Sequence, residues 1–470
     1  MIRHNDIEIV TGEPFSNCKL GRQKYANVLT RIIDAYPSGF VLAINNKWGS
    51  GKTTFVKMWE QELKNNNYQT VYFNAWENDF ENNPLTALMG ELKTLTTESN
   101  EPKFKKALKN AATISKHLIP TLVKALADNY INTDSFKDAI VDVSKGVTDI
   151  FEKDVNDYSE RKKNISEFRR SLSEFIANTS NGKPLVFIVD ELDRCRPNYA
   201  VLILEQIKHF FSVPNIVFVL SIDKTQLGNA IRGVYGSDRI DSDEYLRRFI
   251  DIEYTIPEPE KGLYYKYLYN YFEFSIFFKS ITRVKLRELT SDENHFLEMS
   301  ELLFGDASVS LRQQEKIFSI ARLALRSFQV NSYVIPELYI FLSYLKIIDS
   351  DLYNNIKLKR FSIAELQNRI LPYLKNKITE DNERGLMWLE AYLVLFYNNS
   401  LFGIYDRKNL YDRNGNEEKL KISSIINPAN SDELLKIFKS MDNRHDGGHI
   451  PIEHLLNKLD LMEDIIMQSQ

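Results

Sequence analysis

The pattern of hydrophobic and polar positions shows four short apolar runs in the first half of the chain. The runs do not alternate and are rich in β-branched and aromatic residues, which is typical of strands in a parallel sheet covered on both faces. They occupy residues 40–44, 70–75, 185–189 and 216–221. Helix-like stretches lie between them, so this order predicts an α/β fold with a doubly wound, mostly parallel sheet. Residues 249–257 alternate apolar and polar positions and predict a fifth strand, which Pro257 ends.

The interval between the second and third runs is too long for a single crossover connection. Its Lys- and Glu-rich helical periodicity predicts a helical insertion, and the pattern after residue 258 is almost wholly helical. The predicted parts are an α/β domain over 1–257 with the insertion at about 85–180, a helical lid-like region over 258–362, and a C-terminal helical region over 363–470 with a loop near 412–417.

The first apolar run leads into a glycine-rich loop, followed by an amphipathic helical pattern. In a phosphate-binding loop, consecutive backbone N–H groups converge on a phosphate at the start of a helix. Gly49 and Gly51 allow close approach of the backbone, Lys52 can reach the β- and γ-phosphates, and Thr53 can ligate Mg²⁺. The sheet is therefore predicted to be that of a P-loop NTPase.

Asn46 departs from the G-x-x-x-x-G-K-T pattern at its first letter. This position often requires a positive φ, which Asn tolerates better than most residues other than glycine. The Asn side chain adds bulk but no charge against the phosphates. We therefore expect a tolerated substitution in a working nucleotide site.

Two carboxylates directly follow the third apolar run. Asp190 stands at the carboxyl end of the predicted strand, where ligands bind in open α/β sheets, and is expected to hold Mg²⁺ through water. Glu191 is expected to orient and deprotonate the attacking water. The alternative is a solvated acidic turn.

The end of the fourth run places Ser221 and Asp223 at the same predicted edge. Asp223 is a candidate sensor of the γ-phosphate, and the alternative is that it caps the following helix. Upstream of the first run, Leu20, Gly21 and Arg22 form a plausible adenine-side segment or an ordinary entry to a helix.

Several arginines are candidates for contact with a γ-phosphate, within one subunit or across two. Arg312 begins a helical pattern and resembles a lid arginine, and each of the five has a structural ion pair as its alternative. They are Arg194, Arg196, Arg247, Arg248 and Arg312.

Composition excludes several classes of protein. The net charge of −4 does not demand a polyanionic partner, so binding to nucleic acid is possible but unsupported. The two cysteines, Cys18 and Cys195, form no disulfide framework or zinc cluster, which favours a reduced, cytoplasmic setting. No apolar run is long enough to span a membrane, and a soluble chain is expected. The aromatic-rich segment 262–278 is expected to be core and partner interface rather than a stacking surface for bases.

Taken together, several motifs resemble the KAP family of P-loop NTPases over roughly residues 13–330. The residues that carry the resemblance are NNKWGSGKTT, YFNAWENDF, VDELDRCRP, VLSIDKTQL and EYLRRFIDI. Trp48, the FNAW segment and the LDR segment are not general features of P-loops. The polar insertion differs from the transmembrane helices that the family often carries before its acidic motif.

The resemblance implies an ATPase with ATP and Mg²⁺ as ligands. Its implied acidic motif is Asp190 and Glu191, with Asp193 and Arg194 just beyond, and Glu191 stands where the family commonly has a second Asp. Arg248 matches a position that is usually basic. The implied loop residues are Gly49, Ser50, Gly51, Lys52, Thr53 and Thr54, together with Trp48.

The leading functional hypothesis is an ATP-hydrolysing switch that couples the ATP state to a partner protein or to self-assembly. Some members of the family act in phage exclusion or defence beside partner proteins. One alternative is a scaffold that binds ATP and barely hydrolyses it, which the intact Asp190 and Glu191 disfavour. A second is a phosphotransferase, for which the chain shows no acceptor signature.

Overall fold

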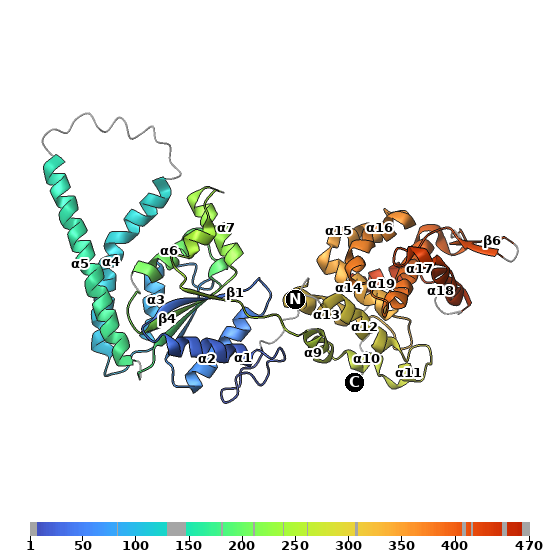
Figure 1. Cartoon of the computed structure of the whole chain (residues 1–470), viewed down its shortest axis with the longest axis horizontal. Helices are drawn as coiled ribbons and strands as arrows, with labels where there is room; N and C mark the ends of the chain where they lie inside the picture. Colours follow the sequence, from blue (N-terminus) through green and yellow to red (C-terminus); the bar gives the residue numbers. More distant parts are fainter. Residues whose placement is uncertain are drawn as a thin grey trace. The chain divides into compact units, whose positions relative to one another are not determined.

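The computed structural model describes residues 7–81, 83–128, 147–179, 182–209, 212–237, 239–260, 262–305, 309–406, 410–414, 417–443 and 449–462. The chain divides into two compact units, Met1–Glu258 and Pro259–Gln470 (Figure 1).

The first unit is the α/β part. Its strands are β1 (Phe40–Asn45), β2 (Thr70–Asn74), β3 (Leu185–Asp190), β4 (Ile216–Ile222) and β5 (Ile252–Tyr254). Its helices are α1 (Gln23–Ala35), α2 (Lys52–Asn65), α3 (Pro84–Lys93), α4 (Glu101–Asp128), α5 (Val147–Thr179), the 3-10 turn η2 (Leu192–Arg194), α6 (Pro197–His209), α7 (Lys224–Tyr235) and α8 (Ser242–Leu246).

The five strands form one parallel sheet in the order β2-β3-β4-β1-β5. Successive strand residues point to opposite faces, and each face buries its own apolar cluster. Leu42 and Ile188 pack with α1 and α2 on one face, while Ala43 and Phe187 pack with α3, α6 and α7 on the other. All β3 and β4 residues are buried, as their unbroken apolar runs predict. The predicted doubly wound parallel fold is confirmed.

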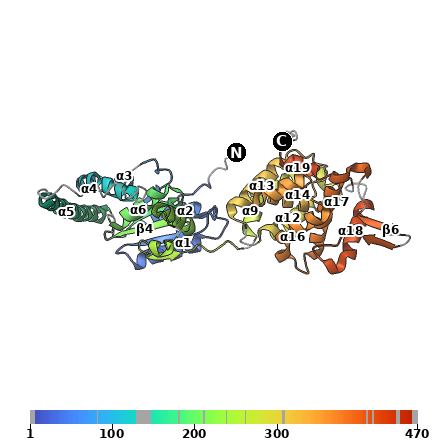
Figure 2. The ribbon, with the colours of Figure 1, turned by 90° about the horizontal axis from the view of Figure 1, so that it is seen from above.

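The predicted helical insertion lies between β2 and β3. Figures 1 and 2 show α4 and α5 side by side, extending away from the sheet. Their contact is aromatic and aliphatic near the sheet, where the ring centroids of Phe104 and Phe175 are 5.2 Å apart. The part of the predicted insertion at 129–146 lies outside the described residues.

The second unit is mostly helical and has one large apolar core. Helix α14 is buried over most of its length in this core, which extends from Tyr265 to Leu459. The elements are α9 (Leu263–Tyr271), α10 (Phe274–Phe278), α11 (Ile281–Val284), α12 (Asp292–Phe304), α13 (Leu311–Leu325), α14 (Pro336–Ile348), α15 (Ser350–Lys357), α16 (Ile363–Leu374), η3 (Lys375–Lys377), α17 (Glu383–Asp406), β6 (Tyr411–Asn414), β7 (Glu417–Leu420), η4 (Pro428–Asn430), α18 (Ser431–Asn443) and α19 (Glu453–Leu459).

The loop expected near 412–417 is wrong in its secondary structure, because β6 and β7 pair as an antiparallel hairpin there. The two residues between the strands are Gly415 and Asn416, and a Gly–Asn pair between two short segments favours a two-residue hairpin connection, so the sequence held a signal for it. The further division near residue 362 stays a prediction. Within the described part of the chain, no helix has both the length and the apolar character that a membrane span needs.

Candidate functional site

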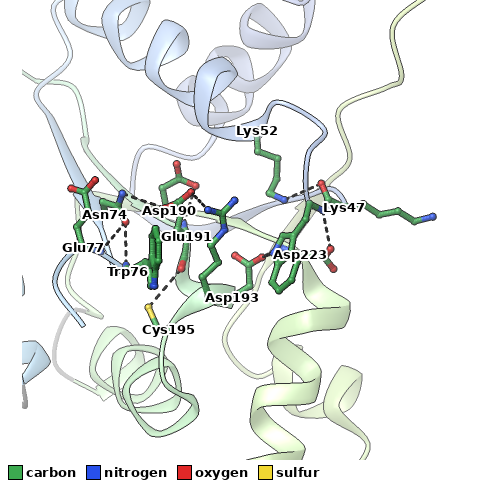
Figure 3. A network of polar contacts seen from close by, with 12 residues as sticks. Lys47, Lys52, Asn74, Trp76, Glu77, Asp190, Glu191, Asp193, Cys195 and Asp223 are labelled. Carbon is green, nitrogen blue, oxygen red and sulfur yellow. Dashed lines mark hydrogen bonds and ion pairs between the residues drawn. The ribbon is translucent and has the colours of Figure 1, made fainter. Parts of the chain in front are cut away.

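Three neighbouring strands end at one edge of the sheet, and each carries part of the site. The glycine-rich loop follows β1, Asp190 ends β3, and Ser221 lies near the end of β4. In the register of the sheet Asp190 is paired with Ser221. Figure 3 shows Lys52 from the loop and the acidic side chains that follow β3 and β4 around this edge.

The loop has the backbone of a phosphate cradle. Gly49 and Gly51 have φ values of 77° and 79°, in the left-handed region that glycine adopts without strain. Gly51 is the N-cap of α2, so the first helical residue is Lys52. The Lys52 ammonium donates hydrogen bonds to the carbonyl oxygens of Asn46 and Lys47. A helix that begins at Lys52 presents its first amides at the end of this loop, which is where a phosphate binds in such loops.

Asn46 was expected to be tolerated because its position requires a positive φ, and this explanation is wrong. Asn46 is not among the residues with positive φ, so its tolerance of that region does not explain its presence. Its amide instead forms two hydrogen bonds with the main chain of Ile256, after β5. Asn46 Nδ2 donates to Ile256 O over 2.9 Å, and Ile256 N donates to Asn46 Oδ1 over 3.0 Å.

Lys52 is buried among carboxylates. Its residue is only 8% exposed, and this burial lowers the pKa of the ammonium. The nearby carboxylates of Asp193, Asp223 and Asp190 act in the opposite direction and raise it. The lysine of the loop and the acidic residues after β3 therefore interact electrostatically in the folded unit.

Asp190 is held in place by two donors. It is 1% exposed and accepts hydrogen bonds from the Tyr72 hydroxyl and from the main chain of Glu191, each over 2.9 Å. The neighbouring Ser221 hydroxyl is fully buried, with no hydrogen-bond partner among the described residues. Mg²⁺ prefers oxygen ligands and keeps several waters, and it often binds through one carboxylate and substrate phosphates. Asp190 and the hydroxyls of Thr53 and Ser221 fit that chemistry.

Glu191 has an unusual backbone. Its φ of 58° lies in the left-handed region, where a residue other than glycine carries strain of about 1–3 kcal/mol. Its carboxylate receives Arg194 Nη1 at 2.8 Å and Asn74 Nδ2 at 3.4 Å. Burial raises the pKa of Glu191, and the Arg194 charge opposes that shift. A half-buried carboxylate of raised pKa beside a nucleotide loop suits a general base.

Asn74 and Arg194 are themselves positioned by the turn after β2. Asn74 Oδ1 accepts the main-chain N–H groups of Trp76 and Glu77, and the Arg194 guanidinium lies 5.8 Å from the centre of the Trp76 ring. Asn74 was missed as a site residue, although it lies within the run 70–75; in the structure it ends β2 and is paired with Asp190 in the sheet. Its place in the FNAW segment was the sequence signal that could have identified it as a site residue.

Trp48 connects the loop to the ends of β3 and β4. Its indole N–H donates to Asp193 Oδ2, which also accepts the main-chain N–H of Asp223 over 3.0 Å. Asp223 Oδ2 in turn accepts the main-chain N–H of Trp48 over 3.1 Å. The other oxygen of Asp223 accepts hydrogen bonds from Thr225 N and Gln226 N. Asp223 therefore both caps α7 and holds the glycine-rich loop at Trp48.

The candidate arginines differ in their surroundings. Arg196 forms an ion pair with Asp79 at 2.6 Å, and Arg247 pairs with Glu244 at 3.1 Å, as the structural alternative predicts. Arg248 is exposed and forms no side-chain hydrogen bond or ion pair within the described chain.

Two further predicted segments lie in different units. Arg22 holds the N-cap position of α1 without a side-chain capping hydrogen bond, and its Nη1 donates to Gly51 O over 3.3 Å. The adenine-side role of Leu20, Gly21 and Arg22 stays a prediction. Arg312 is exposed at the start of α13 in the second unit. Its place in the site stays a prediction.

With this geometry in view, comparison with known proteins is decisive for the family. Residues 22–276 match the KAP family P-loop domain. The chain belongs to the KAP family. Membership of this P-loop family implies that the chain binds a nucleotide.

Comparison of this KAP protein with individual proteins is less informative than the family match. It is 27% identical over 175 residues to an uncharacterized protein of Methanocaldococcus jannaschii, covering 32% of this chain and 89% of the relative. The Aeropyrum pernix ORC2 protein, solved as ADPNP and ADP complexes, is similar with a TM-score of 0.32 and 15% identity over 95% of this chain and 94% of its own. A DNA replication initiation factor gives a TM-score of 0.23 and 11% identity over 80% and 92%. Scores at this level do not establish a shared fold.

Removal of the Asp223 side chain tests the anchoring of the loop. Asp223→Ala should destabilise the protein by about 2–3 kcal/mol, because it removes both a helix cap and the acceptor for Trp48 N. The control is Asp241→Ala, which removes only the exposed cap of α8 and should cost about 1 kcal/mol or less. Urea unfolding followed by tryptophan fluorescence measures both variants, and equal losses would contradict the anchoring role.

Proposed function

We propose that this KAP protein is a Mg²⁺-dependent ATPase that acts as a molecular switch. The observation that carries the proposal is the meeting of the Lys52 loop with Asp190 and Glu191 at one edge of the sheet. The choice of ATP rests on the family resemblance. The positive charge of the loop, the carboxylate for a metal and the carboxylate for a water together supply what hydrolysis of a triphosphate requires.

In the proposed reaction, the backbone N–H groups of loop 49–54 hold the phosphates and Lys52 neutralises part of their charge. Thr53 and Asp190 would hold Mg²⁺, which when bound would neutralise further charge on the phosphate oxygens. Glu191 accepts a proton from water as the water oxygen bonds to the γ-phosphorus. The bond from the γ-phosphorus to the bridging oxygen breaks, and ADP and inorganic phosphate are the products.

The contacts of Glu191 support the assignment of this residue as the base. Asn74 and Arg194 each hold one of its carboxylate oxygens, and the left-handed backbone fixes the direction in which the side chain leaves β3. The ion pair between Arg194 and Glu191 also favours one alternative function. In that alternative the protein binds ATP but hydrolyses it slowly, because the Glu191 carboxylate is held by Arg194 and is not available to water. In the switch that we propose, release of this pair separates the slow state from the active one.

We also propose that the site is completed by another subunit or a partner protein. The exposed Arg248, unpaired in the described chain, supports this, because an arginine supplied in trans needs an accessible guanidinium. Arg312 is the second candidate. A role in defence against phage is suggested by the family resemblance alone.

Turnover and binding should separate in two variants. Glu191→Gln should bind ATP like wild type and lose about 10²–10⁴-fold in turnover, because the amide cannot accept the proton. Lys52→Ala should weaken binding, because the phosphates lose their buried cation. The measurements are phosphate release and calorimetric titration with Mg·ATP. Glu77→Gln, which changes an exposed neighbouring acid, is the control and should resemble wild type. Normal turnover by Glu191→Gln would refute the assignment of the base.

The pH dependence of hydrolysis should report the same residue. A general base works in its ionised form, and burial raises the pKa of Glu191 above its ordinary value of 4.5. The rate should therefore rise with pH to an inflection above 4.5 and then level off. The residual rate of Glu191→Gln should lack this inflection. An identical profile for the two proteins would show that another group takes the proton.

A further inference from the structure

The residue that replaces the first glycine of the loop has a second role. We propose that Asn46 is a positioning residue that couples the nucleotide loop to the segment leaving the first unit after β5. This inference rests on the proposed function, since it concerns how binding at the same loop is transmitted.

The side chain of Asn46 extends the pairing between β1 and β5. Register between these strands ends at Ile44 and Tyr254, and two residues farther along the Asn46 amide occupies both the donor and the acceptor of Ile256. Ile256 is 2% exposed and packs in the core beneath α1 and α2. Glycine has no side chain and cannot form this link.

The main chain of Asn46 is tied to the rest of the site. Its N–H donates to Ile222 O at the end of β4 over 3.1 Å, and its carbonyl accepts from the Lys52 ammonium. One residue therefore contacts β4, the loop lysine and the exit from β5. A phosphate that binds Lys52 competes with the Asn46 carbonyl for this ammonium, so nucleotide binding changes the forces on Asn46.

The chain after Ile256 is suited to pass on such a change. It continues as Pro257, Glu258 and Pro259, and the first unit ends at Glu258. Each proline fixes its own φ, and Pro257 also restricts Ile256, so this segment absorbs little change by local rotation. A shift of Ile256 is carried along the chain towards the second unit.

The preceding residue offers a matched control. Asn45 also links β1 to β5, since its Nδ2 donates to Glu253 Oε1 over 2.8 Å, and its Oδ1 accepts Lys224 N over 3.0 Å. It contacts neither Lys52 nor Ile256 through its side chain. Asn45→Ala therefore removes a comparable tie to β5 without breaking the link from the loop.

Hydrogen–deuterium exchange on the full chain, with and without Mg²⁺ and a non-hydrolysable ATP analogue, tests the proposal. In wild type, nucleotide should protect residues 47–54 and change exchange over residues 254–258. In Asn46→Gly the loop protection should remain and the change at 254–258 should be lost. Exchange of the Ile256 amide without nucleotide should rise about fivefold, since the hydrogen bond from its N–H to the Asn46 side chain is removed. Asn45→Ala should keep the nucleotide-dependent change.

Two results would overturn the inference alone: a nucleotide-dependent change at 254–258 that persists in Asn46→Gly, or its equal loss in Asn45→Ala. Asn46→Ala retains a β-carbon and should behave like Asn46→Gly, so the test does not depend on one variant folding. Absence of loop protection in wild type would instead contradict the proposed function, and the inference with it.

Discussion

The parallel pairing of β1, β4 and β3 is the constraint on which the site depends. Parallel strands end at one edge of the sheet, so segments far apart in sequence meet there without any long-range loop to hold them. The result is one buried ammonium, Lys52, near the carboxylates of Asp190, Asp193 and Asp223, with Glu191 paired to the Arg194 guanidinium beside them. Such a site has an excess of negative charge, and a bound triphosphate would add more. In the proposed reaction, this excess would be offset by a divalent cation held by the β3 carboxylate.

Glu191 combines a strained backbone with a restrained side chain. A left-handed residue persists only where its surroundings over-determine it, and here η2 begins immediately after it. Asn74 and Arg194 then occupy the two carboxylate oxygens, and both are held by the turn at Trp76. The proposed base, Glu191, therefore has both a strained backbone and a carboxylate that two neighbours hold in place.

The sequence was sufficient for the strands and for the main positions of the candidate site. The β3 and β4 runs are recognisable because these strands are buried on both faces and stay apolar until Asp190 and Ser221 near their carboxyl ends. The placement of Asp190 and Lys52 follows from where the flanking elements end. Contacts that depend on the direction of a side chain could not be predicted from the sequence. The indole of Trp48 on Asp193, and the Asn46 amide on Ile256, require the exact path of two loops. The β6–β7 hairpin was missed because polar residues dominate both of its short strands.

The same distinction separates the two roles of Asp223. A strand-end aspartate before a helix permits either capping or sensing, and only the positions of Thr225 N and Trp48 N show that both of its oxygens are engaged within the protein. The hydrogen bonds show that Asp223 caps α7 and anchors the loop, and its role as a sensor of the γ-phosphate stays a prediction.

The most direct test of the central claim is the Mg²⁺ dependence of the affinity for a non-hydrolysable ATP analogue, measured by calorimetry. The account predicts that Mg²⁺ strengthens binding to wild type, and that Asp190→Asn and Thr53→Ala lose this increment while they retain binding without metal. If Asp190→Asn shows the full Mg²⁺ increment, the lysine loop and the β3 carboxylate do not act on one metal-bound triphosphate.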